Sequence, residues 1–354
     1  MKSLAKMTAV ALMAALFAST SNADGRTPGS VLVYPVQRSL GGAFPVQTPP
    51  QFTILNVTNT NLTPAVGVSI GGSTNIMFEY VNVMYDPLPF ANRLKPAMCW
   101  IVDIVEFLTP ADTYSVLTQC HNNGTGQEGY VVVTAQDPAL FKSAWSFNYL
   151  IGSELVITPA GGVYQIDALP FDSLQAEGAA TDVDGDSQLD FDGIEYEGIA
   201  DELYIDSVLA VTSNSLALIN LTGGTEFYAT IKFDAWNNDE YPMSCTKQFK
   251  CWFEVPLFAL DTIFTPGYLF NNTPSALDEL DINCDGIADL DTFWARIRGI
   301  VASSSVESIP DPAILGALTS GRVAGFEGGK SLWESPAKQF NGDFLKFGTD
   351  DPEF

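Results

Sequence analysis

Short runs of β-branched and aromatic residues recur along most of the chain, and this recurrence constrains the fold more than any other feature. Clusters of Pro, Gly and Asn separate the runs. Such spacing is typical of antiparallel strands in an all-β protein. In the first half we expect strands at 31–36, 51–59, 75–83, 99–108, 112–118, 129–135, 145–151 and 154–158.

A second series of runs follows an acidic, turn-rich segment. Between residues 226 and 236 apolar side chains alternate with polar ones, which is the period of a half-buried strand. The strands expected here are 202–211, 216–222, 226–236, 249–258 and 293–303. Residues 312–320 fit either a last strand or a short helix, and the glycine-rich tail from Gly325 is expected to be weakly ordered.

The length of 354 residues exceeds what one hydrophobic core usually serves, so two domains are expected. The number and spacing of the strands fit immunoglobulin-like or fibronectin-like β-sandwiches. We therefore predict an all-β protein of two such domains. The predicted parts are an N-terminal β-sandwich at 24–169, an acidic calcium-loop linker at 170–201, a C-terminal β-sandwich at 202–324 and a tail at 325–354.

The N-terminus has the composition of a secretory signal peptide. Two lysines precede an apolar run from Met7 to Ala18, and small residues then end at Ala23. We expect residues 1–23 to be removed, and the mature chain to be secreted to the periplasm, the cell surface or the medium. No later run reaches the roughly 18 apolar residues that a transmembrane helix needs, so membrane insertion is not expected.

Acidic residues far outnumber basic ones. The chain has 42 Asp and Glu against 16 Lys and Arg, which gives a formal net charge of −26. Loss of the signal peptide would remove Lys2 and Lys6 and leave 14 basic residues, a net charge of −28. Such a surface repels phosphate backbones and anionic headgroups, which argues against nucleic-acid and membrane partners. It attracts cations.

Five cysteines stand in a chain that is expected to be exported, where disulfides persist. Cys99 and Cys120 bracket two expected strands, and Cys245 and Cys251 bracket a short hairpin-like segment, so we predict these two disulfides. Cys284 is then left over, and it could instead pair with Cys245 or Cys251.

Two acidic loops have nearly the same spacing, DVDGDSQLDFDG at 182–193 and DINCDGIADLD at 281–291. Helix-flanked calcium loops supply oxygens from positions 1, 3, 5, 9 and 12 and a backbone carbonyl from position 7. Both loops match through position 9 and lack an acid at position 12, so Asp192, Glu195, Asp291 or a distant acid would have to substitute. The predicted metal ligands are Asp182, Asp184, Asp186, Gln188, Asp190, Asp192, Asp281, Asn283, Asp285, Ile287, Asp289 and Asp291.

The local charge balance favours a metal. No Lys or Arg stands between Lys142 and Lys232, whereas the segment from Asp172 to Asp206 holds 12 carboxylates. Like charges so close raise one another's pKa or open the loop unless a cation neutralises them. Calcium suits flexible, oxygen-only loops better than magnesium does, so we expect structural Ca²⁺. The alternative is a solvated acidic linker.

The alternation of oxygen-bearing residues at positions 1, 3, 5, 9 and 11 resembles the loops of dockerin modules and of thrombospondin type 3 repeats. The resemblance is confined to the two loops and implies calcium binding there; the paired helices of a dockerin are missing. The segments LDFDGIEY at 189–196, VLVYP at 31–35 and FTILNVTNTN at 52–61 are similar to secreted bacterial β-rich proteins of unknown function. This resemblance implies an exported β-rich protein and gives no activity to carry over.

No catalytic constellation stands out, and we predict that the protein is not an enzyme. The single histidine, His121, lies in a polar turn, and no GxSxG motif precedes a helix. A polysaccharide hydrolase with paired carboxylates is one alternative, with Asp103, Glu106 and Asp234 as strand candidates. A carbohydrate-binding protein is another, and its aromatic platform would draw on Trp100, Trp145, Trp236 or Trp252.

The leading hypothesis is therefore a secreted, calcium-stabilised, non-catalytic protein with a structural, adhesive or surface-binding role. Its expected partner is an extracellular glycan or a cell-surface protein.

Overall fold

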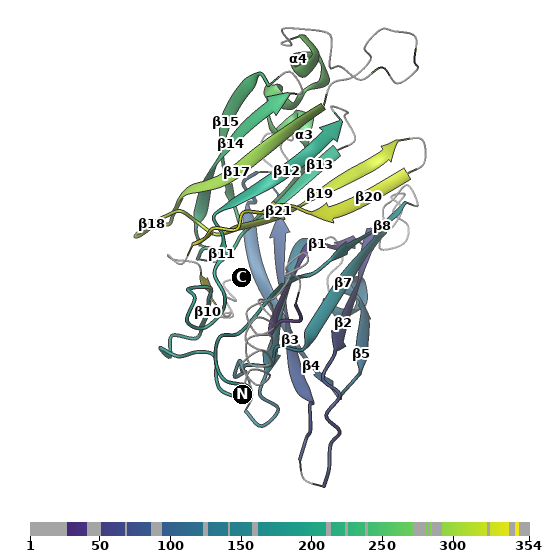
Figure 1. Ribbon diagram of the computed structural model, residues 1–354, viewed down its shortest axis with the longest axis vertical. Helices are drawn as coiled ribbons and strands as arrows, with labels where there is room; N and C mark the ends of the chain where they lie inside the picture. Colours follow the sequence, from purple (N-terminus) through teal and green to yellow (C-terminus); the bar gives the residue numbers. More distant parts are fainter. Residues whose placement is uncertain are drawn as a thin grey trace, which may run out of the picture.

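The computed structural model is nearly all β and is built from antiparallel sheets (Figure 1), which confirms the predicted fold class at this level. The structure describes residues 27–40, 51–67, 69–85, 94–122, 127–140, 142–157, 162–209, 214–223, 226–237, 240–271, 281, 284, 292–323, 326–339 and 344–346. The predicted signal peptide lies outside these ranges.

The N-terminal half forms one hydrogen-bonded sheet of nine strands. Its main path runs β4-β3-β6-β1-β2-β7-β8, while β5 pairs with β2 and β9 pairs with β1. The strands are β1 (Val31–Leu40), β2 (Gln51–Asn59), β3 (Thr74–Met84), β4 (Met98–Leu108), β5 (Thr113–Leu117), β6 (Gln127–Gln136), β7 (Leu150–Ile157), β8 (Val163–Asp167) and β9 (Leu169–Phe171). One edge of β1 pairs with β6 and the other with β9 and then β2, so β1 joins the two parts of the sheet.

The C-terminal half forms two sheets that enclose a core. The larger sheet has the order β15-β14-β17-β12-β21, with β18 on β17, and the smaller has the order β16-β13-β19-β20. The strands are β12 (Glu202–Leu209), β13 (Asn214–Asn220), β14 (Tyr228–Asn237), β15 (Pro242–Lys250), β16 (Trp252–Pro256), β17 (Thr292–Ser303), β18 (Ser308–Pro310), β19 (Ile314–Val323), β20 (Phe326–Ser331) and β21 (Trp333–Glu334). Strict alternation in β14 buries Ala229, Ile231 and Phe233 against the smaller sheet, as the sequence predicted.

Short helices occupy a few connections. They are α2 (Thr118–His121), α3 (Leu257–Leu260), the 3₁₀ helix η2 (Thr262–Phe264) and α4 (Pro266–Asn271). Most expected strands are present, with two differences. Residues 145–149 precede β7 in turns and isolated bridges, and the expected strand 249–258 is divided at Cys251, whose φ of 57° breaks the extended backbone between β15 and β16.

The tail that was predicted to be weakly ordered contributes four strands in its described part. β20 pairs with β19 and β21 with β12, while β22 (Lys338–Gln339) pairs with β11 (Ile199–Ala200) and β23 (Phe344–Lys346) pairs with β10 (Gln188–Asp190). Gly329 serves close packing there, since a Cβ on it would lie 2.6 Å from the ring of Tyr164 in β8. Glycine content was therefore a misleading sign of disorder here.

The predicted disulfide pairing is wrong. Cys99, at the start of β4, is bonded to Cys251, between β15 and β16, and the thiols of Cys120 and Cys245 are free. Cys245 and Cys251 lie six residues apart along an extended strand, a span of about 20 Å that a disulfide cannot bridge. Cys120 follows β5, which pairs with β2 and does not return along β4. The observed bond instead joins the two halves of the chain.

A shared core accompanies this bond. One buried cluster combines Val31 and Tyr130 of the N-terminal sheet with Ala217 and Leu315 of the smaller C-terminal sheet. Trp252 is completely buried at this junction, and its indole N–H donates to the carbonyl of Pro35 at 2.8 Å. The two halves therefore share apolar packing and a covalent link.

Candidate functional site

The first acidic loop is held between buried anchors. Leu189, Phe191 and Tyr196 are completely buried, and the ring of Phe191 packs against the rings of Phe171 and Tyr196. The hydroxyl of Tyr196 shares a 2.8 Å hydrogen bond with Thr181 at the start of the loop. The segment predicted to be a linker is therefore packed on both sides of its carboxylates.

Backbone amides orient the carboxylates of this loop. The N–H of Gly185 donates to Asp182 at 2.8 Å, that of Asp186 to Asp184 at 3.1 Å, and that of Gln188 to Asp186 at 2.9 Å. Positive φ angles at Gly185 and Ser187 turn the chain tightly enough for these bonds. The backbone thus fixes one oxygen of Asp184 and one of Asp186, and both oxygens of Asp182, whose second oxygen accepts the N–H of Ser187 at 3.3 Å.

Two groups of carboxylates converge in the loop. Asp182, Asp184 and Glu195 form one group, and Asp184, Asp186 and Asp190 form the other; within each group one ligand oxygen per residue lies within 4.8 Å of the others. Such groups are spaced to share a cation, and all donors are oxygens, as calcium prefers. Asp184 belongs to both groups.

The carboxylate of Asp192, a predicted ligand, takes no part in either group. A carboxylate oxygen of Asp192 accepts the N–H groups of Ile194 and Glu195, which closes the following turn. The side-chain amide of Gln188 donates to Asp186, whereas the predicted ligand is the backbone carbonyl of Gln188, which stays a prediction. Asp192 therefore has an evident structural role in the turn that delivers Glu195.

From the sequence, Glu195 was predicted only as one possible substitute for the acid that is missing at position 12. It is 3% exposed, and its carboxylate accepts the N–H groups of Val183 and Asp190. These bonds bring it to Asp182 and Asp184, which lie thirteen and eleven positions earlier in the chain. This proximity was not predicted from the sequence, because the regular calcium-loop spacing places the last acid at position 12 and Glu195 lies beyond it.

Electrostatic repulsion inside the loop is visible in two pKa values. Burial, followed by the neighbouring charges of Asp186, Asp184, Asp192 and Asp182, raises the pKa of Asp190 to about 7. Burial and Asp190 raise the pKa of Glu195 to about 7, against its backbone hydrogen bonds. A bound cation would remove this penalty for the ionised forms.

A small pocket of about 120 Å³ separates this loop from the N-terminal sheet. It is lined by Met77, Asp103, Lys142, Ser143, Ala144, Asp182 and Ser187. The ammonium group of Lys142 lies 2.9 Å from Asp103. Directly opposite Asp103 across the strands is Glu79, which is completely buried and whose carboxylate oxygens have no hydrogen-bond partner among the described residues.

Replacing Glu79 with glutamine is expected to flatten the dependence of stability on pH. Burial, and then the charge of Asp103, holds the pKa of Glu79 well above its usual range, so the folded protein keeps a proton that the unfolded chain loses. The stabilisation that this retained proton gives is complete below about pH 4.3, the pKa of glutamate in the unfolded chain. It is lost as the pH rises through the pKa of Glu79 in the folded protein. Thermal melts in chelator from pH 5 to pH 9 should show Tm falling more steeply for the wild type than for Glu79→Gln.

The control for this experiment is Glu307→Gln, because Glu307 is exposed. It should keep the wild-type slope. Equal slopes for Glu79→Gln and the wild type would show that Glu79 is ionised in the folded protein.

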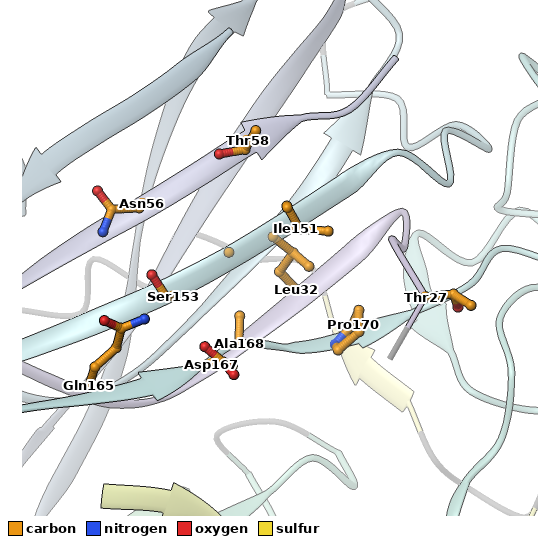
Figure 2. Close-up of a pocket in the computed structure, with 11 residues that line it drawn as sticks. Thr27, Leu32, Asn56, Thr58, Ile151, Ser153, Gln165, Asp167, Ala168 and Pro170 are labelled. Carbon is orange, nitrogen blue, oxygen red and sulfur yellow. The ribbon is translucent and has the colours of Figure 1, made fainter. Parts of the chain in front are cut away.

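A second hollow lies on the N-terminal sheet and has a volume of about 320 Å³ (Figure 2). Asn56 of β2, Ser153 of β7 and Asp167 of β8 are register partners, so an amide, a hydroxyl and a carboxylate stand in a row across three strands. Ile151, Ala168 and Pro170 add apolar contacts at the same pocket. The volume is within the usual range of about 300–1,000 Å³ for small-ligand sites.

The candidate catalytic residues have structural partners. His121 Nδ1 lies 2.7 Å from the hydroxyl of Tyr80, and Nε2 lies 3.6 Å from Glu106. Burial lowers the pKa of His121. Asp234 forms ion pairs with Lys232 and Arg296, whose hydrogen bonds and charges lower its pKa despite desolvation.

The candidate tryptophans are dispersed. Trp252 lies in the junction core, Trp145 stacks on Phe147 and donates to Thr74, and half-buried Trp100 lies on β4. Trp236 stacks on Trp294 with the ring centroids 4.2 Å apart. The four therefore do not form one platform.

The second acidic loop falls almost entirely outside the described residues. Asn283, Asp285, Ile287, Asp289 and Asp291 lie outside them, while Asp281 is half-buried and Cys284 carries an exposed free thiol. Its predicted role stays a prediction.

In the part of the chain that the structure describes, no helix is long and apolar enough to cross a membrane. Comparison with protein-family models, with curated proteins and with solved structures finds no match for this chain.

Proposed function

We propose that the protein is secreted and non-catalytic, and that calcium bound in the first acidic loop stabilises it for a structural, adhesive or surface-binding role. The observation that carries the proposal is the convergence of Asp182, Asp184 and Glu195, with Asp186 and Asp190 beside them. Oxygen-only donors and flexible Asx turns favour calcium over magnesium. Dissociation constants of extracellular calcium modules, about 10⁻⁴ to 10⁻³ M, suit a structural ion.

We further propose that the two halves are immunoglobulin-like β-sandwich domains that meet at this loop. Two cores support the division, since one cluster includes only N-terminal residues such as Tyr34 and Phe78, and another is built around Phe233 and Phe253. The acidic loop lies between β9 and β12 in the sequence, and its strand β10 pairs with β23 of the tail. A cation there would fasten the junction between the halves.

Calcium is expected to raise the melting temperature of the mature chain, Asp24–Phe354. A ligand at about one hundred times its dissociation constant stabilises the folded state by about 2.7 kcal/mol. Asp184→Asn should abolish most of this gain, because Asp184 belongs to both carboxylate groups. The measurement is a thermal melt with millimolar calcium and with chelator.

Asp192→Asn is the matched control. Its amide oxygen can still accept the N–H groups of Ile194 and Glu195, and its carboxylate lies outside both groups. This variant should keep the calcium response. A melting temperature that is the same in calcium and in chelator would refute the proposed role of the metal.

Carbohydrate binding is a second candidate function, and the pocket in Figure 2 favours it. The row of Asn56, Ser153 and Asp167 offers hydrogen-bond donors and acceptors to sugar hydroxyls, and Ile151 offers an apolar contact. A glycan array probed with the wild type and with a Ser153→Phe variant, which fills the pocket, tests it. Retention of all glycan signals by the variant would exclude this pocket as the glycan site.

A further inference from the structure

Asp311, in the turn between β18 and β19, has an unusual backbone conformation directly before a proline. Its φ is 59°, and it is the only described non-glycine residue with a positive φ that precedes a proline. A residue before proline is normally held to an extended conformation with negative φ, so the backbone at Asp311 is strained. Strain of this kind gathers at functional sites.

Neighbouring strands hold both sides of the Asp311–Pro312 peptide bond. On one side, the N–H of Asp311 donates to the carbonyl of Ile300 in β17 at 3.2 Å. On the other, Pro312 is buried against Gly299, where an added Cβ would lie 2.5 Å from the carbonyl oxygen of Pro312. The strained backbone is therefore fixed in place by the fold.

The carboxyl group of Asp311 meets a second carboxyl group, that of Asp201. The two are hydrogen-bonded, and they share a proton because one carboxyl group has to donate it. Burial, and then the charge of Asp201 and this hydrogen bond, raise the pKa of Asp311 to about 6; Arg298 opposes the rise and Glu202 adds to it. Neither Asp201 nor Asp311 belongs to the carboxylate groups that we assign to calcium.

An aspartyl–proline bond is chemically the weakest peptide bond toward acid. The proline nitrogen is a tertiary amide without an N–H group, and it accepts a proton more readily than other peptide nitrogens. The aspartate carboxylate is tethered close to the carbonyl carbon of its own residue, so its attack there is intramolecular. A proton donor beside such a bond supplies the remaining requirement, which is protonation of the leaving amine.

We propose that the chain cleaves itself once, at the Asp311–Pro312 bond, with Asp311 as the nucleophile and Asp201 as the proton donor. A carboxylate oxygen of Asp311 bonds to its own backbone carbonyl carbon, and the bond from that carbon to the nitrogen of Pro312 breaks. Asp201 gives its proton to this nitrogen, which leaves as an amine. Water then opens the cyclic anhydride, which leaves two carboxyl groups on Asp311 and returns a proton to Asp201. The net reaction consumes one water molecule.

The two pieces are expected to stay together after cleavage. Strand β19 remains paired with β13 along Asn214–Asn220, and its side chains Leu315 and Leu318 are buried in the two cores that β13 also serves. Residues 312–354 contain no cysteine, so no disulfide ties them to the rest of the chain. The pieces should therefore remain associated in the native protein and separate in denaturant. A single self-cleavage is not turnover, and it is compatible with a non-catalytic role of the cleaved protein.

Intact-mass spectrometry in denaturant, after the folded mature chain has been incubated near the pKa of Asp311, tests the proposal. We expect two fragments, one ending at Asp311 and one beginning at Pro312, whose summed mass exceeds that of the intact chain by one water molecule. Asp201→Asn should slow the cleavage about 100-fold, the effect of losing a general acid. Asp311→Asn, a residue type that tolerates positive φ, should remove it.

The Asp137–Pro138 bond is a control within the same chain. Asp137 has no positive φ, and its carboxylate accepts the N–H of Ala139 at 2.7 Å. This bond should stay intact while Asp311–Pro312 is cleaved, and Asp137→Asn should leave the cleavage rate unchanged. In denaturant the preference for Asp311–Pro312 should disappear, because the strain and the carboxyl pair exist only in the folded chain.

Three results would overturn the proposal. The first is a wild type that remains one chain, and the second is equal cleavage at both aspartyl–proline bonds of the folded protein. The third is a rate that is the same in Asp201→Asn as in the wild type, with both proteins shown to be folded by their melting curves. Cleavage that persists in both asparagine variants would identify a contaminating protease as its cause.

Discussion

Replacing Trp252 with alanine is expected to destabilise the protein by about 3–5 kcal/mol, the usual cost of removing a large buried aromatic side chain. Trp252 is completely buried in the core that both halves share. Its indole N–H donates to Pro35 of β1, and its carbonyl accepts the hydroxyl of Tyr85 at 3.2 Å. The substitution would open a cavity where the halves meet and leave the Pro35 carbonyl without its donor.

Chemical denaturation of the variant measures this loss. Trp252→Phe keeps most of the volume but removes the N–H group, so it should cost about 1–3 kcal/mol, the penalty for an unsatisfied buried acceptor. Trp333→Ala is the exposed control and should fall within about 0.5 kcal/mol of the wild type in dilute solution. An effect of Trp252→Ala no larger than that of Trp333→Ala would show that the two halves do not depend on this packing.

Removal of the Cys99–Cys251 disulfide is expected to destabilise the protein by about 5 kcal/mol in the chain-entropy description. The bond closes a loop of 152 residues, and long loops lose the most entropy when they are closed in the unfolded chain. It also fixes the start of β4 to the turn between β15 and β16 at the shared core. Cys99→Ser with Cys251→Ser should therefore lower the denaturation midpoint strongly.

The free thiols give the matched control for the disulfide. Cys120→Ser replaces an exposed thiol and should change little. Reductant should lower the midpoint of the wild type toward that of the double variant and leave the double variant unaffected. A wild type whose midpoint is insensitive to complete reduction would mean that the bond adds no stability.

Trp252 and the Cys99–Cys251 disulfide lie in the same region, where the two halves of the chain are joined in three ways. The shared apolar cluster, the disulfide and the half-buried ion pair between Arg38 of β1 and Glu254 of β16 all connect the first sheet to the C-terminal half. A partner-induced rotation of one half against the other would break all of them. We expect the junction to behave as a rigid support for the surfaces around it.

Local sequence patterns predicted the strands well where alternation was strong. Strand β14 buries every second side chain, and the run 51–59 coincides with β2. The strand pattern did not predict the break at Cys251, where a positive φ divides the expected strand. The glycine content of the tail did not predict the close packing at Gly329. Those features depend on neighbours that are remote in sequence.

The acidic loop was recognisable from its spacing, but the approach of Glu195 to its carboxylates was not. Asp184, Asp186 and Asp190 of the motif form one group of carboxylates, whereas Glu195, from outside the motif, joins Asp182 and Asp184 after the chain turns back between the buried Phe191 and Tyr196. The disulfide pairing failed for the same reason. Nearness in sequence suggested local pairs, and the packing of the two halves determined the actual one.

The most direct test of the calcium site is anomalous diffraction at long wavelength from crystals of the mature protein grown with calcium. We expect an anomalous peak within bonding distance of carboxylate oxygens of Asp182, Asp184 and Glu195. Crystals in calcium that show no peak in this loop, with these carboxylates ordered, would contradict it.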